Sequence, residues 1–335
     1  MADEIVILSP GLDQSKAIGE LLRRSNPARR LTGALMPGEV KPLFRYPFDT
    51  IRSFHKEEAR NSSHMIPTGA LSTALLLECG DIRLGEVTMS REALRFYDKP
   101  WSIDAALVAG VPVPETWYSA DAIESFPVFF KSATEGGGRR GLARQRGDLP
   151  DDLGDLIFQE YIDSPGTYGV GIVAAEGRLL AAHAHREVES YPASGGSAAI
   201  IERVADERLL GHVERLIRHA GFSGWGLVEF KYCPRRDDYV FMEVNAKFWA
   251  STEFAFRNEP LLPQLLFDAT PVGGPCRRMI FMHRVLQRGP GFLLKLPGIV
   301  QGGEIRFAPG AWQGPAAKLF VPHRAVTLLR NLRNR

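Results

Sequence analysis

The stretch FPVFFKSATEGGGRRG, residues 126–141, joins a dense apolar segment to three consecutive glycines. Its first part, 126–132, has the apolar and aromatic content of a strand. Glycines cannot pack side chains and lose much backbone entropy when they become ordered, so three in a row need a reason. Two interpretations are open: a flexible hairpin tip, or a loop of backbone N–H groups that covers phosphates, with Lys131 beside it.

The composition of the chain is that of a globular protein. Its 335 residues are 44% hydrophobic and 24% charged, which is enough for two or three packed domains. The three cysteines, Cys79, Cys233 and Cys276, form no CxxC pair, which argues against a disulfide scaffold or zinc site and favours a reducing compartment. The N-terminus lacks the features of a signal peptide, and no apolar run reaches about 18 residues. We therefore expect a cytoplasmic protein.

Charge is distributed unevenly along the chain. The net charge is +2, but residues 271–335 carry eleven Lys and Arg and one acid, a balance of +10, which leaves −8 for the first 270 residues. Such asymmetry predicts that the C-terminal segment meets an anionic partner. The alternative is a basic surface that faces the acidic body of the same protein.

The start of the chain has the pattern of an α/β domain. EIVILS (4–9) predicts a strand and SKAIGELLRR (15–24) a helix, with a loop between them. That loop has one glycine and no GxGxxG, so an NAD-dependent enzyme built on this domain is disfavoured.

The rest of the chain alternates helical and extended patterns. A loop and a helix are predicted within 66–78, and further helices at 100–110 and 206–222. Residues 111–117 are expected to be extended. Strands are predicted at 156–162, 225–233 and 238–249, and as a pair around Glu176-Gly177 within 167–189.

The last two predicted strands place acids together. Glu243 and Asn245 are two residues apart and therefore share a face, and a hairpin can bring Glu229 alongside them. A strand acid commonly faces water, but Glu229 and Glu243 lie within apolar runs, where a buried carboxylate needs a cation. Two carboxylates and an amide oxygen form the hard oxygen set that Mg²⁺ takes beside substrate phosphates.

Two lysines extend this constellation toward a nucleotide. Lys131 enters the glycine loop from a strand, and Lys99 lies in the segment YDKP. A Walker loop requires GxxxxGK[ST], which is missing, and a protein kinase places its glycine loop before its lysine. The sequence therefore predicts a nucleoside triphosphate site of another design.

The order of these motifs resembles the ATP-grasp superfamily, in its carbamoyl-phosphate-synthase-like branch of carboxylate–amine ligases. The resemblance runs from about residue 64 to 260, and its carriers are DKPWSIDAALVAGVPVPETW (98–117), FPVFFKSATEGGGRRG (126–141), FQEYIDSPG (158–166) and VEFKY…FMEVNAKFWAS (228–251). It implies an α/β (α+β) fold, with an N-terminal Rossmann-like domain before two α+β subdomains that clamp ATP. The implied domains are 1–95, 96–163, 164–270 and a basic C-terminal extension, 271–335.

The resemblance implies nucleotide contacts. Lys99 and Lys131 would contact the ATP phosphates under the glycine loop, and a hinge centred on Glu160 would read adenine. The implied cofactor-binding set is Lys99, Lys131, Glu135, Gly136, Gly137, Gly138, Gln159, Glu160, Tyr161, Ile162 and Asp163. Mg²⁺, with Mn²⁺ as an alternative ion, would be held by Glu229, Glu243 and Asn245.

It also implies catalytic residues. Arg186 would meet the phosphate or the acyl phosphate, with Asn245 and Lys247 as further catalytic groups, and SGGS (194–197) would lie near the acceptor. Two positions depart from the family pattern. Lys247 stands where an arginine is common, which removes a bidentate fork, and Thr167 stands where an acid often binds the ribose.

The implied reaction is ATP-dependent amide formation. A carboxylate is a poor electrophile, and its phosphorylation to an acyl phosphate provides a good leaving group for attack by an amine. The expected products are ADP and phosphate, in small-molecule or surface-polysaccharide biosynthesis. The alternative is an ATP-binding regulatory or scaffold protein with degenerate activity, which Lys247 and Thr167 favour.

The expected partners are small-molecule carboxylate and amine substrates, with no nucleic acid. The C-terminal segments FLLKLPGIV (292–300) and VPHRAVTLLRNLRNR (321–335) indicate either peripheral contact with an anionic membrane or lipid-linked acceptor, or a packing helix with a solvated basic edge. A homo-oligomer is compatible with the sequence.

Several single residues are assigned to packing or left open. Ser251 either touches substrate or caps the next segment. Core or surface roles are expected for His183, His185, Arg139, Arg140, Trp225, Phe248 and Trp249.

Overall fold

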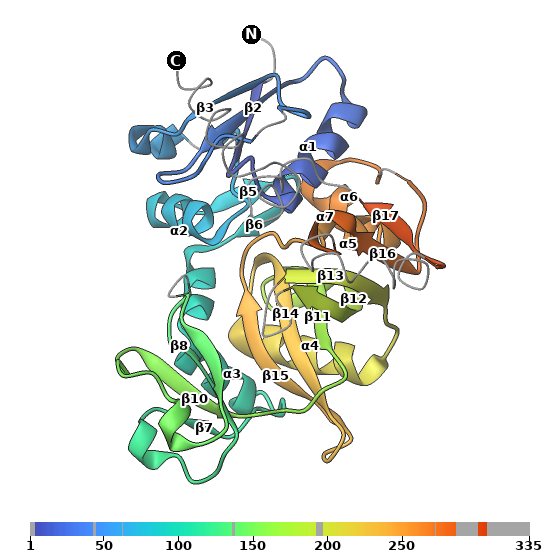
Figure 1. The fold of residues 1–335 in the computed structure, drawn as a ribbon. Helices are drawn as coiled ribbons and strands as arrows, with labels where there is room; N and C mark the ends of the chain where they lie inside the picture. The colour runs from blue at the N-terminus through green and yellow to red at the C-terminus, as the bar shows by residue number, and fades with distance from the viewer. Residues whose placement is uncertain are drawn as a thin grey trace, which may run out of the picture.

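The computed structural model describes residues 4–42, 45–61, 63–135, 138–191, 197–271, 273–285 and 301–306 (Figure 1). Several predictions lie outside the described residues: those for Gly136 and Gly137, for 194–196, and for the segments 292–300 and 321–335.

The N-terminal part of the chain forms a parallel four-stranded sheet in the order β3-β2-β1-β4. Its elements are β1 (Glu4–Leu8), α1 (Asp13–Ser25), β2 (Arg30–Leu35), β3 (Thr50–Ser53), β4 (Met65–Ile66) and α2 (Ala70–Cys79). Parallel strands are covered on both faces, and β1 is accordingly an apolar run whose Val6, Ile7 and Leu8 are fully buried. The predicted strand, helix and α/β domain are confirmed.

A smaller antiparallel sheet follows in the order β7-β10-β8-β9, at the lower left of Figure 1. Its strands are β7 (Thr116–Trp117), β8 (Val128–Ser132), β9 (Arg140–Ala143) and β10 (Leu156–Glu160), and α3 (Lys99–Val108) precedes them. The carboxylate of Asp98 caps α3 by accepting the N–H of Trp101, and Gly110 follows the helix with a φ of +70°. This sheet has a small core of its own around Trp117, Val128 and Phe158.

The largest sheet has seven strands in the order β15-β14-β11-β12-β13-β16-β17. They are β11 (Thr167–Ala175), β12 (Arg178–Tyr191), β13 (Ser197–Arg203), β14 (Gly224–Cys233), β15 (Asp238–Asn245), β16 (Arg278–Phe281) and β17 (Glu304–Arg306). The turn at Glu176-Gly177 is where the sequence placed it. β15 ends at Asn245 rather than at residue 249, because the chain turns there, with the N–H of Lys247 bonded to the Asn245 carbonyl.

Helices cover the two faces of this large sheet. α4 (Glu207–Ala220) lies on the face that carries Phe230, whose ring stacks on His212. α5 (Thr252–Asn258) lies on the opposite face, where Phe254 contacts His183 and His185 edge-on, and α6 (Leu261–Phe267) follows it. The face opposite α4 is therefore covered only in part by helices, and its β14–β15 edge faces the small sheet (Figure 1).

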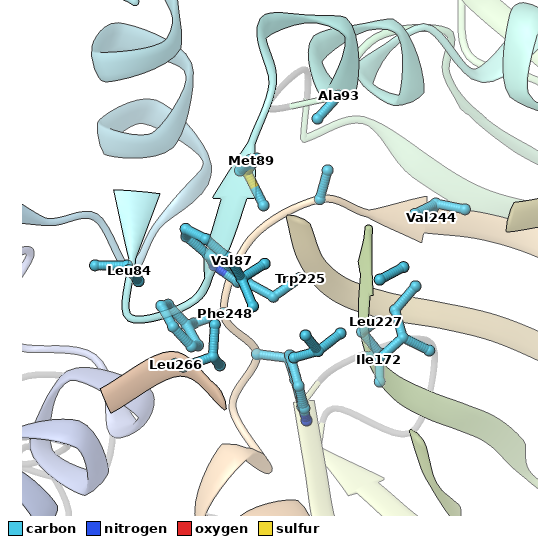
Figure 2. Close-up of a cluster of buried hydrophobic side chains, with 14 of the residues drawn as sticks. Leu84, Val87, Met89, Ala93, Ile172, Trp225, Leu227, Val244, Phe248 and Leu266 are labelled. Carbon is cyan, nitrogen blue, oxygen red and sulfur yellow. The ribbon is translucent and has the colours of Figure 1, made fainter. Parts of the chain in front are cut away.

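A short hairpin connects the N-terminal domain with the large sheet. β5 (Ile82–Leu84) and β6 (Val87–Met89) place Leu84, Val87 and Met89 against Trp225 and Phe248 (Figure 2). Trp225, Phe248 and Trp249 are all buried, as predicted. The N-terminal domain, the hairpin and the large sheet therefore share one continuous hydrophobic core.

The C-terminal residues that the structure describes join the body of the protein. β16 pairs with β13, β17 pairs with β16, and α7 (Met282–Val285) follows β16. Their arginines pair with acids of the earlier chain: Arg278 with Glu202, Arg284 with Asp13, and Arg306 with Glu20 and Glu253. For these three arginines, the alternative of a basic surface that faces the acidic body of the same protein is correct. None of the described helices is long and apolar enough to span a membrane.

Gly171 provides a test of the packing between β11 and the segment after β15. A Cβ at this position would overlap the ring of the buried Trp249. We expect Gly171→Ala to lower the free energy of unfolding by about 1–3 kcal/mol in urea denaturation.

The matched control is Gly211→Ala in α4, where a Cβ meets nothing closer than Arg215 Nη1 at 3.7 Å. This variant should be more stable by up to about 1 kcal/mol, because alanine favours a helix. Equal stability of both variants would contradict the packing described for Trp249.

Candidate functional site

The hairpin of β14 and β15 brings the predicted carboxylates together. Glu229 and Glu243 are directly opposite each other in the strand register. Asn245 Nδ2 donates to Glu229 Oε2 at 3.1 Å and to Glu243 Oε1 at 3.3 Å. The arrangement that the alternation of strand side chains predicted is therefore present.

The pKa values of the two glutamates are shifted in opposite directions. Burial, followed by the charge of Glu243, raises the pKa of Glu229 well above its usual value. Burial also raises the pKa of Glu243, but Lys131 and Lys99 outweigh it and lower that pKa to about 2. In the absence of a further cation, Glu243 is thus the ionised member of the pair.

The donor set fits a divalent cation that is shared with a ligand. Among the described residues, Glu229 has no ion pair. The described part of the chain also contains no metal-binding group made of three or more His, Cys, Asp or Glu side chains, so a metal here would have only two carboxylates from the protein. The two carboxylates supply part of an octahedral shell, and Asn245 Oδ1, which accepts from Lys247, would join them once the amide turns. Mg²⁺ commonly completes such a shell with substrate phosphates and water. Glu229, Glu243 and Asn245 are therefore suited to a metal that arrives with a phosphorylated ligand.

Lys131 reaches the carboxylates from the small sheet. Its Nζ donates to the carbonyl of Met242 at 3.0 Å and lies 3.6 Å from Glu243 Oε2. Only 9% of its side chain is exposed, and burial lowers its pKa. This ammonium spans the gap between β8 and β15, so the two sheets meet at a charged contact.

Two more lysines lie at the same place. Lys99 Nζ donates to the carbonyl of Thr134 at 3.2 Å and lies 3.7 Å from Glu135 Oε2. Lys247 Nζ contacts Glu135 Oε1 at 2.8 Å and Asn245 Oδ1 at 2.5 Å. Glu135 therefore contacts cations, and its backbone N–H is bonded to Tyr97. Gly138, with a φ of +70°, belongs to the described part of the glycine loop.

The predicted hinge continues from β10. Glu160 accepts the N–H of Glu115 at 3.1 Å and forms ion pairs with Arg236 and Arg235, so its side chain anchors the hinge to the β14–β15 turn. Ile162 is buried, and Tyr161 and Asp163 follow the end of the strand. The carbonyl oxygen of the Gln159 side chain is buried and has no hydrogen-bond partner among the described residues.

Arg186 is not where the sequence predicted. It is opposite Tyr168, which in turn pairs with Phe230, and this row faces α4. Glu229 pairs with Gly169, which on its other side pairs with His185, and this row lies on the opposite face. Because strand side chains alternate, Arg186 points away from the carboxylates, and it forms an ion pair of 3.1 Å with Glu202.

A second polar row lies beside the carboxylates and has no motif in the sequence. Lys231 and Glu187 both pair with Thr167, two residues along from Glu229 and on its face. Lys231 Nζ donates to Thr167 Oγ1 at 2.8 Å, and Glu187 Oε2 accepts from Ser190 at 2.9 Å. The spacing of Lys231 from Glu229 was the available sequence signal for this row.

The remaining single residues have structural contacts. Ser251 precedes α5 without a side-chain cap, and its Oγ lies 3.3 Å from His185 Nε2, so capping is not its role. Arg139 pairs with Asp152, and Arg140 is exposed in β9. His183 and His185 are buried, as expected for packing residues.

Comparisons with known proteins identify the architecture. No protein-family model matches the chain. Pyruvate carboxylase 1 of Caenorhabditis elegans is 27% identical over 185 residues, which cover 46% of this chain and 15% of that protein. Among solved structures, Rhizobium etli pyruvate carboxylase has a TM-score of 0.59 at 14% identity, covering 76% of this chain and 27% of its own.

Two further solved structures match over more of their length. The β,γ-ATP complex of biotin carboxylase from Campylobacter jejuni has a TM-score of 0.57 at 17% identity, and the match covers 77% of this chain and 68% of that chain. An L-amino acid ligase from Bacillus licheniformis has a TM-score of 0.57 at 10% identity, covering 80% and 75%.

The chain has the ATP-grasp fold. The sheets that meet at Lys131 are the two α+β subdomains of that fold, and the parallel sheet β1–β4 is the expected N-terminal domain. The chain spans only 15% of the curated relative and 27% of the first solved structure.

His183 and His185 give the protein a sensitivity to acid. Burial lowers the pKa of His183 to about 4 and that of His185 to about 3, whereas an unfolded chain protonates imidazoles near pH 6.5. Between these values the unfolded state binds more protons, so the free energy of unfolding falls as the pH drops below about 6.5. From about pH 7 to about pH 5 we expect a loss of about 2 kcal/mol per imidazole in urea denaturation.

The variant His185→Asn should flatten this pH dependence by the share of one imidazole. His219→Asn, on the exposed side of α4, should leave it unchanged. The same steep pH dependence in His185→Asn and in the unaltered protein would contradict the neutral, buried state of His185.

Proposed function

We propose that the protein is an ATP-dependent carboxylate–amine ligase that forms an amide bond through an acyl phosphate. The observation that carries this proposal is the contact of Lys131 with Glu243 and the Met242 carbonyl. This contact brings the ammonium group of Lys131, from the small sheet, to the oxygen atoms of the large sheet. Phosphoryl transfer needs this combination, because charge at the transferred group must be neutralised from more than one side.

The nucleotide would lie between the two sheets. Lys99, Lys131 and Lys247 would contact its phosphates, and the segment Gln159–Asp163 would hold the base. The buried Gln159 Oε1 is an acceptor that a base amino group can satisfy. The ion pairs of Glu160 with Arg235 and Arg236 would keep that segment in place.

The metal would be held by Glu229, Glu243 and Asn245. When bound, it neutralises phosphate charge and orients the transferred group. The lysines would supply the remaining positive charge, and the partly covered face of the large sheet would limit the access of water. The row of Lys231, Thr167 and Glu187 supplies one cation and one acid on that face, beside the carboxylates, for the carboxylate and amine substrates.

A regulatory or scaffold protein that binds ATP with degenerate activity is the second proposal. The position of Arg186 on the opposite face and its pairing with Glu202 favour this alternative. Lys247 also lacks the bidentate fork of an arginine. Both proposals predict nucleotide binding, and only the first predicts acyl transfer.

Calorimetry tests the nucleotide site. We expect binding of ATP to be strengthened by Mg²⁺, and Glu243→Gln to lose at least about tenfold in affinity, the effect of about 1.4 kcal/mol. The control is Glu214→Gln, an exposed glutamate of α4, which should bind as the unaltered protein does. If the unaltered protein binds no ATP with or without Mg²⁺, both proposals are wrong.

Trapping with hydroxylamine then separates the two proposals. A panel of carboxylates is incubated with ATP, Mg²⁺ and hydroxylamine, and a hydroxamate together with ADP indicates an activated carboxyl group. Lys131→Met should abolish the signal. ATP binding without a hydroxamate from any carboxylate in the panel would favour the regulatory alternative.

A further inference from the structure

Glu135 lies within the cluster of lysines proposed to bind phosphate. Its Oε1 is 2.8 Å from Lys247 Nζ and its Oε2 is 3.7 Å from Lys99 Nζ. The carboxylate thus bridges two cations from different parts of the chain, α3 and the turn after β15. The three side chains are only 10–21% exposed, so solvent screens these ion pairs less than it screens surface pairs.

The backbone holds Glu135 at this place. Its N–H is bonded to the carbonyl of Tyr97 at 2.8 Å, and Thr134 pairs with Asp98 in an isolated bridge. The N–H of Lys99 donates to the Ala133 carbonyl at 2.8 Å. These backbone bonds hold residues 133–135 against the start of α3. They therefore fix the position from which the Glu135 carboxylate contacts Lys99 and Lys247.

Each lysine of the site has a carboxylate partner within the protein. Lys131 is paired with Glu243, whereas Lys99 and Lys247 are paired with Glu135. Glu243 also belongs to the proposed metal set, but Glu135 contacts neither Glu229 nor Asn245 in any described hydrogen bond. The described ion pairs of the Glu135 carboxylate are therefore with Lys99 and Lys247, the two lysines that a phosphate would otherwise contact.

We propose that Glu135 is an internal competitor for the anionic ligand, which weakens the binding of weakly charged phosphates and selects for a metal-bound polyphosphate. The inference rests on the proposed nucleotide site. A ligand must displace the carboxylate from Lys99 and Lys247 or bind beside it, and either costs affinity. A polyphosphate brings enough charge and a metal to compensate, whereas a single phosphate group does not.

The test is calorimetric titration of the full chain with inorganic phosphate, pyrophosphate and ADP, each with Mg²⁺. We expect Glu135→Gln to bind pyrophosphate about three- to tenfold more tightly, as expected when two partly exposed ion pairs no longer compete. The relative gain for inorganic phosphate should be larger than that for ADP. Raising the salt concentration should reduce the gain.

Three control variants assign the effect to the carboxylate. Glu124→Gln removes one exposed glutamate of the same subdomain and should leave the affinities unchanged. Glu135→Asp keeps the charge on a shorter side chain and should show a smaller gain than Glu135→Gln. In a Lys247→Met background, Glu135→Gln should give a smaller gain, because the two side chains are coupled.

The outcomes separate this inference from the function on which it rests. If the unaltered protein binds Mg²⁺-ADP but Glu135→Gln binds pyrophosphate equally or more weakly, Glu135 is no competitor and the nucleotide site stands. The same gain in Glu124→Gln would also overturn the inference. If neither the unaltered protein nor Glu135→Gln binds ADP or pyrophosphate, the proposed function itself is wrong.

Discussion

Lys131 connects the two sheets of the site, and the remaining charges are arranged around this contact. A buried ammonium costs several kcal/mol unless it is paired and hydrogen-bonded. The Met242 carbonyl and Glu243 satisfy it from the opposite subdomain. The contact holds β8 against β15, and the charge of Lys131 lowers the pKa of Glu243, so the contact that joins the two sheets also keeps this carboxylate ionised.

The lysines of the site already have partners within the protein. Three lysines and three glutamates lie together, and each lysine contacts a carboxylate. These contacts reduce the cost of burying the three ammonium groups. In the proposed function, binding would be an exchange of partners, in which phosphate and metal replace these contacts, and the affinity would reflect the difference between the two sets.

The large sheet separates structural from chemical charges by its faces. On β12, His185 and Glu187 belong to the face of Glu229, whereas Arg186 belongs to the face covered by α4. At the C-terminal edge, Arg284 and Arg306 also have structural partners, because they pair with acids of the N-terminal domain and α5. A basic residue near a motif can therefore serve packing, depending on which side of the strand it occupies.

The local elements and the grouping of Glu229, Glu243 and Asn245 could be predicted from the sequence. Apolar runs and turn residues are local properties, so β1, α1, α4 and the β11–β12 turn lie close to where the sequence predicted them. Glu229, Glu243 and Asn245 belong to one hairpin, and alternation alone brings them together. Only the tertiary structure decided that Arg186 faces away and that Glu135 meets Lys247, 112 residues further along the chain. Register between distant strands and contacts between subdomains depend on how whole elements pack, which no short segment specifies.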